Sequence, residues 1–265
     1  AEVVATEWYQ KGNPVLRSQL ENIRRAGFMA SGDPLISFAG KMNTADIMRL
    51  ADAGIPLARL DSLLSRGSVV SASWLFGARG RAMVDSLGLT PASDEKLLDS
   101  LDVPMTSIDA IYIPISGAEE IGMVSTQLVY YNLRAQILGS GEWKDISELD
   151  VNKRYCDGVE FESDSYADSG NGAYTSFLND FVGRFKKNPG KNCLFGYDAA
   201  RLMLMLVAGG ATTRESLTRA LATVRDFRGL HSRIGLVGRR VNPWLHILKY
   251  TSDNIERVGE INANE

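Results

Sequence analysis

The sequence predicts an α/β protein built around a parallel sheet, and three segments indicate this class. Residues 108–116 are short, apolar and β-branched, as in a buried strand. Residues 120–133 then place apolar side chains close to helical spacing, and residues 136–139 form a second buried strand that glycines follow. Two strands joined through a helix make a βαβ unit, and right-handed units of this kind build parallel sheets.

The composition is that of a soluble globular protein, with 45% hydrophobic and 23% charged residues. Its length of 265 residues allows one large domain or two ordinary ones. A formal net charge of -3 gives no drive toward nucleic acid. No apolar run reaches the roughly 18 residues needed to span a bilayer. The chain begins inside a strand pattern without Met, so we interpret it as a mature product or a fragment cut from a longer protein.

The N-terminal part of the chain predicts one strand and helix, followed by a mostly helical block. Residues 2–6 are expected to form a strand, and residues 15–26 an amphipathic helix with Gly27 as its C-cap. We interpret residues 28–107 as an insertion, because they separate this unit from the next one. Helices are expected in the insertion at residues 45–53, 57–65, 73–87 and 93–101.

Beyond the central unit, strong helices lie between predicted strands. A short helix or loop is expected over residues 145–151. Further helices are predicted at residues 173–187, 196–208 and 213–224. The chain then turns at residues 227–229 and crosses back over residues 230–238. Strands are predicted at residues 157–161, 244–250 and 255–261.

The order of these segments resembles the second lobe of type I periplasmic solute-binding proteins, the receptors of branched-chain amino acid transport systems and their relatives. The segments that carry it are VVATEWYQKG, LRSQLENIRRAG, DAIYIPIS, QLVYYNL, ILGSGEW, DGVEFESDSYAD, FLNDFVGRFKKNPG, GYDAARLML and SLTRALATVRDFRGLHSRIGL. The IYIP strand, the QL-YY helix and the LGxxxW segment look in particular like lipoproteins described as penicillin-binding protein activators. The resemblance covers residues 1–27 and 108–261.

The resemblance implies a three-layer, parallel-sheet lobe of the type I periplasmic binding protein fold with a helical insertion. Residues 1–27 and 108–162 would form the core of the second lobe, and residues 28–107 the insertion. Residues 163–235 would hold helices that belong to lobe one, and residues 236–265 the final strands. By this resemblance, most of the first lobe would be missing. We therefore expect apolar faces on the lobe-one helices to be exposed and to support weak self-association.

Polar residues follow the first central strand, at the edge where open parallel sheets bind ligands. Ser116, Gly117 and Glu119 could hold a small polar solute through hydroxyl and backbone N–H groups. The alternative is an ordinary loop, with Glu119 near a helix N-terminus where the helix dipole favours it.

Glu142 and Trp143 follow the next strand. The resemblance implies an acidic residue near this point that pairs with the ammonium of an amino acid. The alternative is that Trp143 packs on the lobe and Glu142 is solvated. Tyr166 lies at the expected crossover between lobes, where a ligand contact and a role in hinge structure are both open.

The sequence carries no motif for enzyme chemistry, and we predict no enzyme, no cofactor and no metal. His231 and His246 are the only histidines, and neither has a metal-ligand spacing. There is no G-x-S-x-G elbow, no P-loop and no G-x-G-x-x-G. Cys156 and Cys193 lack zinc spacing, so a disulfide and two free thiols are both open.

Two functions follow from the resemblance. The first is an extracytoplasmic protein of the periplasm or cell envelope, which would bind an amino acid or a related small polar solute for an ABC-type membrane transporter. The alternative is an envelope lipoprotein that regulates a cell-wall synthase through protein–protein contact and has no transported solute. The sequence does not identify the solute.

Overall fold

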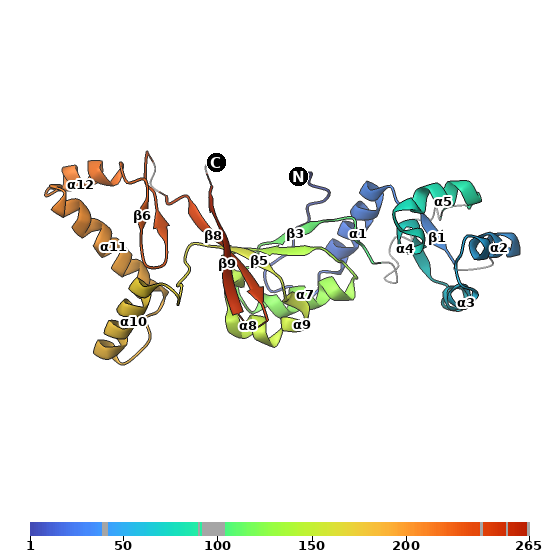
Figure 1. Ribbon diagram of the computed structural model, residues 1–265, viewed down its shortest axis with the longest axis horizontal. Coiled ribbons are helices and arrows are strands. Elements are labelled where there is room, and N and C mark those ends of the chain that lie inside the picture. Colours follow the sequence, from blue (N-terminus) through green and yellow to red (C-terminus); the bar gives the residue numbers. More distant parts are fainter. Residues whose placement is uncertain (39–41, 90, 92–103, 239–240, 253, 264–265) are drawn as a thin grey trace. The chain divides into compact units, whose positions relative to one another are not determined.

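The described part of the chain forms two compact units. In this computed structural model the described residues are 1–38, 42–89, 91, 104–238, 241–252 and 254–263. The first unit comprises Ala1–Ile111 and Glu119–Ile137, and the second comprises Tyr112–Ala118 and Leu138–Glu265. Figure 1 shows their helices and strands. Among the described residues, no helix has the length and apolar character needed to cross a membrane.

The first unit is largely helical. Its elements are α1 (Arg17–Ser31), β1 (Leu35–Ser37), α2 (Thr44–Asp52), α3 (Leu57–Arg66), β2 (Val69–Ser71), α4 (Ala72–Phe76), the 3-10 turn η1 (Gly77–Arg79), α5 (Gly80–Leu87) and α7 (Glu120–Tyr130). The helix expected over residues 73–87 is broken at Gly77, which has a φ of 68°. The helix expected over residues 93–101 lies outside the described residues.

The block expected to be mostly helical also contains a small sheet. Strands β1 and β2 pair antiparallel, with Leu35 opposite Ser71. Their apolar side chains pack with the surrounding helices into one buried core: Ile36, Phe38, Leu50, Ile55, Leu60, Leu63, Val70, Ala72, Leu75, Val84 and Leu89. Because this core draws on both strands and on α2 to α5, the block has an apolar interior of its own.

The strand expected at residues 2–6 is absent, so this prediction was wrong. Residues 1–10 form no strand, and 79% of Val3 is exposed. A strand needs a neighbouring strand to pair with, and the described fold supplies none to this segment. Instead, Tyr9 Oη donates a hydrogen bond to Glu120 Oε2 at 3.2 Å, and the Gly12 amide donates to Glu120 Oε1 at 3.3 Å. Burial and the Glu120 charge raise the pKa of Tyr9 to about 12.

Helix α1 continues past Gly27, which was expected to be its C-cap. A Cβ on Gly27 would lie 2.7 Å from Met105 Sδ, so glycine serves close packing there, and Gly32, with a φ of 58°, ends the helix. One turn earlier, the fully buried Arg24 donates to the backbone carbonyls of Tyr131 and Asn132, just beyond the end of α7. A cation at this position also interacts favourably with the dipole of α7.

A mixed five-stranded sheet with the order β3-β4-β5-β8-β9 confirms the α/β class, and its strands β5, β8 and β9 lie wholly in the second unit. The sequence predicted a parallel sheet, and the β4–β5 pair is parallel, whereas β8 pairs antiparallel with both β5 and β9. Figure 1 shows α8 and α9 against one face of this sheet. The elements are β3 (Ala110–Ile113), β4 (Gln136–Gly139), the 3-10 turn η2 (Gly141–Trp143), α8 (Ile146–Val151), α9 (Lys153–Cys156), β5 (Glu160–Ser163), β8 (Trp244–Thr251) and β9 (Asn254–Asn262).

Between β5 and β8 the chain leaves the sheet and forms a group of helices. These are α10 (Gly172–Phe185), α11 (Lys191–Ala208) and α12 (Arg214–Leu221), followed by a hairpin of β6 (Phe227–Arg228) and β7 (Arg233–Ile234). Neither α10 nor α12 has a buried residue. The apolar exposure expected for these helices is confirmed most clearly on α11, where 68% of Leu204 and 49% of Met205 are exposed.

We expect Arg24→Ala to lower the free energy of unfolding by about 2–4 kcal/mol, because it removes a charged donor and leaves buried carbonyls without it. Urea denaturation would measure the change. Arg17→Ala on the same helix is the control, since the Arg17–Glu21 ion pair lies at the surface and should contribute little. Equal losses in the two variants would contradict this role for Arg24.

Candidate functional site

One buried tryptophan fastens the loops that follow β3 and β4. Trp143 has no exposed surface, and its indole Nε1 donates a hydrogen bond to the Ile113 carbonyl at 3.0 Å. A Cβ on Gly139 would overlap the indole ring, so only glycine lets the ring lie against β4. The Ser140 hydroxyl adds a 3.4 Å hydrogen bond to the Ile115 carbonyl. These contacts hold the two loops side by side at the carboxyl end of the strands.

The predicted site residues of the second unit lie in or beside these loops. Ser116 and Glu142 are exposed, and Gly117 is half-buried. Trp143 is wholly inside the fold, so it can serve a site by positioning the loops rather than by offering its own surface. Glu119 is exposed at the N-cap position of α7, which belongs to the first unit.

A lysine that the sequence did not single out joins this edge to the end of β5. Lys144 Nζ donates to Ser163 Oγ at 3.4 Å, to Ser165 Oγ at 3.2 Å and to the Ser165 carbonyl. Both serines are buried, whereas Lys144 as a whole is an exposed residue. Burial lowers the pKa of Lys144 to about 8, against the opposing charge of Asp164 and with a smaller contribution from the charge of Lys191.

The two segments that connect the sheet with the helices meet at the His231 backbone. The Tyr166 amide donates to the His231 carbonyl at 2.8 Å, and His246 Nε2 lies 3.1 Å from the same oxygen. Because a carbonyl only accepts, this nitrogen carries the proton. Asp198 on α11 accepts from the Leu230 amide at 2.7 Å, and its Oδ2 lies 2.6 Å from His231 Nδ1. The outgoing segment, the returning segment, α11 and β8 therefore share one buried polar cluster.

The expected site residue Tyr166 lies in this cluster. Its ring centroid is 6.3 Å from that of His246 and 5.8 Å from the Arg257 guanidinium carbon. On the other side of the imidazole, His246 Nδ1 is 3.3 Å from Glu260 Oε1. Burial lowers the pKa of His246, and the charges of Arg257 and Lys144 act in the same direction, against the His231 carbonyl and Glu260.

Sequence reasoning missed Lys144 and the Asp198–His231 pair. Asp198 stands inside an otherwise apolar helical pattern, and a carboxylate in that setting requires buried partners. That pattern was a readable signal. No sequence pattern singles out Lys144, because a lysine after a tryptophan is common. Its role becomes visible only in the fold, where the end of β5 brings Ser163 and Ser165 to its ammonium.

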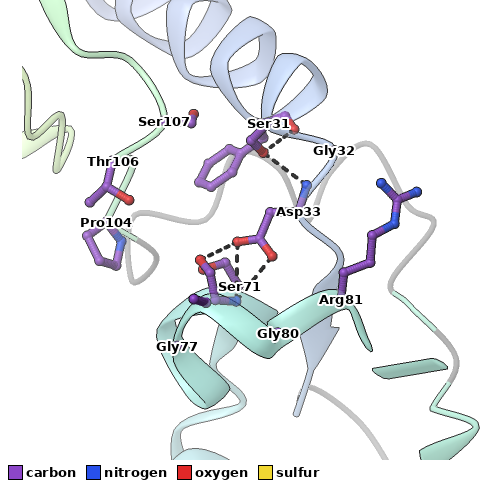
Figure 2. Close-up of a pocket in the computed structure, with 13 residues that line it drawn as sticks. Ser31, Gly32, Asp33, Ser71, Gly77, Gly80, Arg81, Pro104, Thr106 and Ser107 are labelled. Carbon is purple, nitrogen blue, oxygen red and sulfur yellow. Dashed lines mark hydrogen bonds between the residues drawn. The ribbon is translucent and has the colours of Figure 1, made fainter. Parts of the chain in front are cut away.

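The first unit has a separate polar cavity of about 320 Å³ (Figure 2). Its walls include Ser31, Asp33, Ser73, Arg81 and Thr106. The Asp33 carboxylate accepts from both the Ser73 amide, at 3.1 Å, and the Ser73 hydroxyl. This carboxylate therefore joins the start of β1 to α4 and is engaged within the fold.

Cys156 and Cys193 are free thiols, so the structure has two free thiols rather than a disulfide. Cys156 is buried, its Sγ lies 3.2 Å from the Asn152 carbonyl, and burial raises its thiol pKa to about 11. A thiol held in its protonated form is a poor nucleophile. Over the described ranges, no group of three His, Cys, Asp or Glu side chains could hold a metal ion.

No protein-family model matches the chain, and no curated protein matches it. Among solved structures it resembles a leucine-binding protein from Thermotoga maritima, at 20% identity and a TM-score of 0.43, over 59% of this chain and 45% of that one. It also resembles a periplasmic ligand-binding protein of a branched-chain amino acid ABC transporter from Burkholderia xenovorans, at 17% identity and a TM-score of 0.44, over 83% and 62%.

A third similar structure is a fatty acid ABC transporter substrate-binding protein from Thermomonospora curvata, at 14% identity and a TM-score of 0.44, over 84% of this chain and 64% of that one. The chain therefore spans less than two thirds of the length of each of these three proteins.

We expect Gly139→Ala to displace Trp143 and to lower the free energy of unfolding by about 1–3 kcal/mol, because the new methyl group would overlap the indole. Tryptophan fluorescence during urea denaturation would report both effects. Gly183→Ala on α10 is the control, since nothing lies within 4 Å of its Cβ position, and there alanine should be neutral or slightly stabilising. An unchanged denaturation midpoint for Gly139→Ala would contradict the packing described.

His246 should make stability depend on pH. Because its folded-state pKa is lowered, the unfolded chain binds the proton more readily, so this contribution is present above the unfolded pKa of about 6.5 and is lost as pH falls. His246→Gln keeps a donor for the His231 carbonyl but does not titrate. The stability advantage of the native chain over this variant should therefore shrink between about pH 7.5 and pH 5. A constant difference across that range would contradict the assignment.

Proposed function

We propose that this chain provides the second lobe and the hinge of an extracytoplasmic solute-binding protein that serves an ABC-type membrane transporter. One observation carries the proposal. Loops bearing Ser116, Glu142 and Lys144 gather at the carboxyl end of β3 and β4, beside the segments that lead from the sheet to the helices. Ligands of open α/β sheets bind at this end of the strands.

The residues at this edge suit a small polar solute. Ser116 offers a hydroxyl, Gly117 a backbone N–H that a ligand can approach closely, and Glu142 a carboxylate for an ammonium group. Hydrogen bonds from Trp143 and Ser140 to backbone carbonyls after β3 hold these loops together. We assign the edge to an amino acid or a related solute, with Tyr166 at the hinge margin of the site.

The cluster around the His231 carbonyl supports the hinge part of the proposal. It ties the segment that leaves β5 to the segment that returns to β8, through Tyr166 and His246. Hinges are a few residues at the ends of elements that absorb backbone rotation while the bodies on either side stay intact. Two adjacent crossing segments held by so few hydrogen bonds meet that description.

The exposed apolar side chains of α11 support the proposal that another part of a two-lobed protein packs against this helix. Leu204 and Met205 lie open on a helix that is apolar around most of its circumference, and such helices are normally buried. Without that packing partner, we expect two copies of the chain to associate through the exposed apolar surface of α11. No observation among the described residues favours the alternative of a cell-wall synthase regulator.

A thermal-shift screen tests the proposal. We expect at least one amino acid, from a panel of amino acids, amides and cell-wall peptides, to raise the melting temperature of the chain, because a ligand that binds only the folded state stabilises it. Glu142→Ala should weaken that binding about tenfold or more, as expected for loss of a hydrogen bond to a charged group.

Glu215→Ala is the matched control, since Glu215 is an exposed carboxylate on α12 that pairs with Arg219. It should leave binding unchanged. Absence of any shift across the panel, with the chain folded, would overturn the solute-binding proposal and leave protein–protein contact as the function to test.

A further inference from the structure

We propose that the polar cavity of the first unit binds a compact neutral ligand rich in hydroxyl groups, such as a monosaccharide. All the residues that line this cavity fall within 28–107, the part of the chain that the resemblance to solute-binding proteins does not cover. The cavity is therefore separate from the sheet edge proposed above, and the inference does not depend on the proposed function.

The cavity lies where the block of residues 28–107 joins the rest of the first unit. Its walls come from the end of α1, the turn before β1, the segment from α4 to α5 and residues 104–107. Ala72, Leu75 and Val84 of α4 and α5 belong to the buried core of the block, so these walls rest on packed side chains. The volume of about 320 Å³ is at the lower end of the range for ligand sites, about 300–1,000 Å³, which suits a small ligand.

Two side chains of opposite charge line the cavity without pairing with each other. Within the described ranges neither Asp33 nor Arg81 forms an ion pair, and the Arg81 guanidinium makes no hydrogen bond (Figure 2). Asp33 is half-buried and Arg81 is exposed, so a ligand can reach both. An ion of either sign would be attracted by one of these groups and repelled by the other. A neutral hydroxyl group can instead donate to the carboxylate or accept from the guanidinium.

A chain of hydrogen bonds holds the Asp33 carboxylate in place. The Trp74 amide donates to Ser71 Oγ at 3.2 Å, Ser71 Oγ lies 3.2 Å from Ser73 Oγ, and the Ser73 hydroxyl donates to Asp33. Because the Ser73 hydroxyl has only one hydrogen, Ser71 is the donor in the middle link. Asp33 thus accepts two hydrogens from Ser73, one from its amide and one from its hydroxyl. A carboxylate has about four acceptor sites, so Asp33 can also accept from a ligand.

Other lining groups match the remaining features of a sugar. The Arg81 guanidinium lies against Gly32, where a Cβ would come within 3.3 Å of Arg81 Nη1, so glycine leaves room for this donor. The Thr106 hydroxyl makes no hydrogen bond within the described residues, so it can donate to a ligand and accept from it. Phe28 adds an apolar part to the wall, against which the C–H groups of a sugar ring can pack.

Titration calorimetry with glucose, galactose, ribose and N-acetylglucosamine tests the inference. We expect at least one of these sugars to bind the chain. Arg81→Met should weaken that binding about tenfold or more, because it removes a charged donor. Thr106→Val, which removes only a hydroxyl group, should weaken it about two- to tenfold. Arg79→Met is the matched control, since Arg79 is exposed and does not line the cavity, and it should leave binding unchanged.

An NMR titration of the unaltered chain gives a second readout, in case a variant does not fold. The backbone amide signals of Asp33, Ser73 and Thr106 should shift when the sugar that binds is added, whereas the Glu142 amide should not. Shifts at Glu142 without shifts at the cavity would place the sugar at the sheet edge and overturn the inference.

Inorganic phosphate and leucine are titrated alongside as charged probes. If either binds in an Arg81-dependent manner while the sugars do not bind, the cavity selects for charge and the assignment to a neutral ligand is wrong. Absence of sugar binding, or binding that Arg81→Met and Thr106→Val leave unchanged, would also overturn the inference. These failures leave the proposed function intact, because Glu142→Ala tests that function at the sheet edge.

Discussion

The burial of Trp143 between the loops of β3 and β4 is the contact on which the proposed site depends. An indole fills a large volume in the core and carries one N–H donor that must find an acceptor when buried. Here the Ile113 carbonyl accepts it, and the missing side chain of Gly139 makes room for the ring. The same contact fixes the backbone on either side, and Glu142 and Lys144 are those neighbours. The packing of Trp143 in the core therefore also determines where the charges of Glu142 and Lys144 lie.

A second constraint is the satisfaction of buried polar groups where the chain leaves the sheet. Asp198, His231 and His246 are almost fully buried, and each would be costly there without partners. Asp198 and His246 Nε2 find backbone partners in the crossing segments, the Leu230 amide and the His231 carbonyl, and His231 Nδ1 lies 2.6 Å from Asp198 Oδ2. A helix, two connecting segments and a strand are therefore joined by polar contacts at this point.

Sequence pattern predicted the parts of the fold that depend on local chemistry. The helices after β5 and the two last strands follow from apolar spacing, and β4 ends at a glycine as expected. The failures arose where distant partners decide. The strand expected at residues 2–6 has the right residues but no neighbouring strand, and Gly27 looked like a cap although Met105 packs against it. Strands β1 and β2, only three residues each, are too short to give a periodic signal.

The site was partly predictable for the same reason. Ser116, Gly117 and Glu142 follow strands directly, so their position at the sheet edge can be read from the chain alone. Lys144 and Ser165 are 21 residues apart and meet only because β4 and β5 are adjacent. Ser165 immediately precedes Tyr166, whose amide donates a hydrogen bond to the His231 carbonyl. Through two adjacent residues, Lys144 therefore links the end of β4 to the point where the segment leaving β5 meets the segment returning to β8.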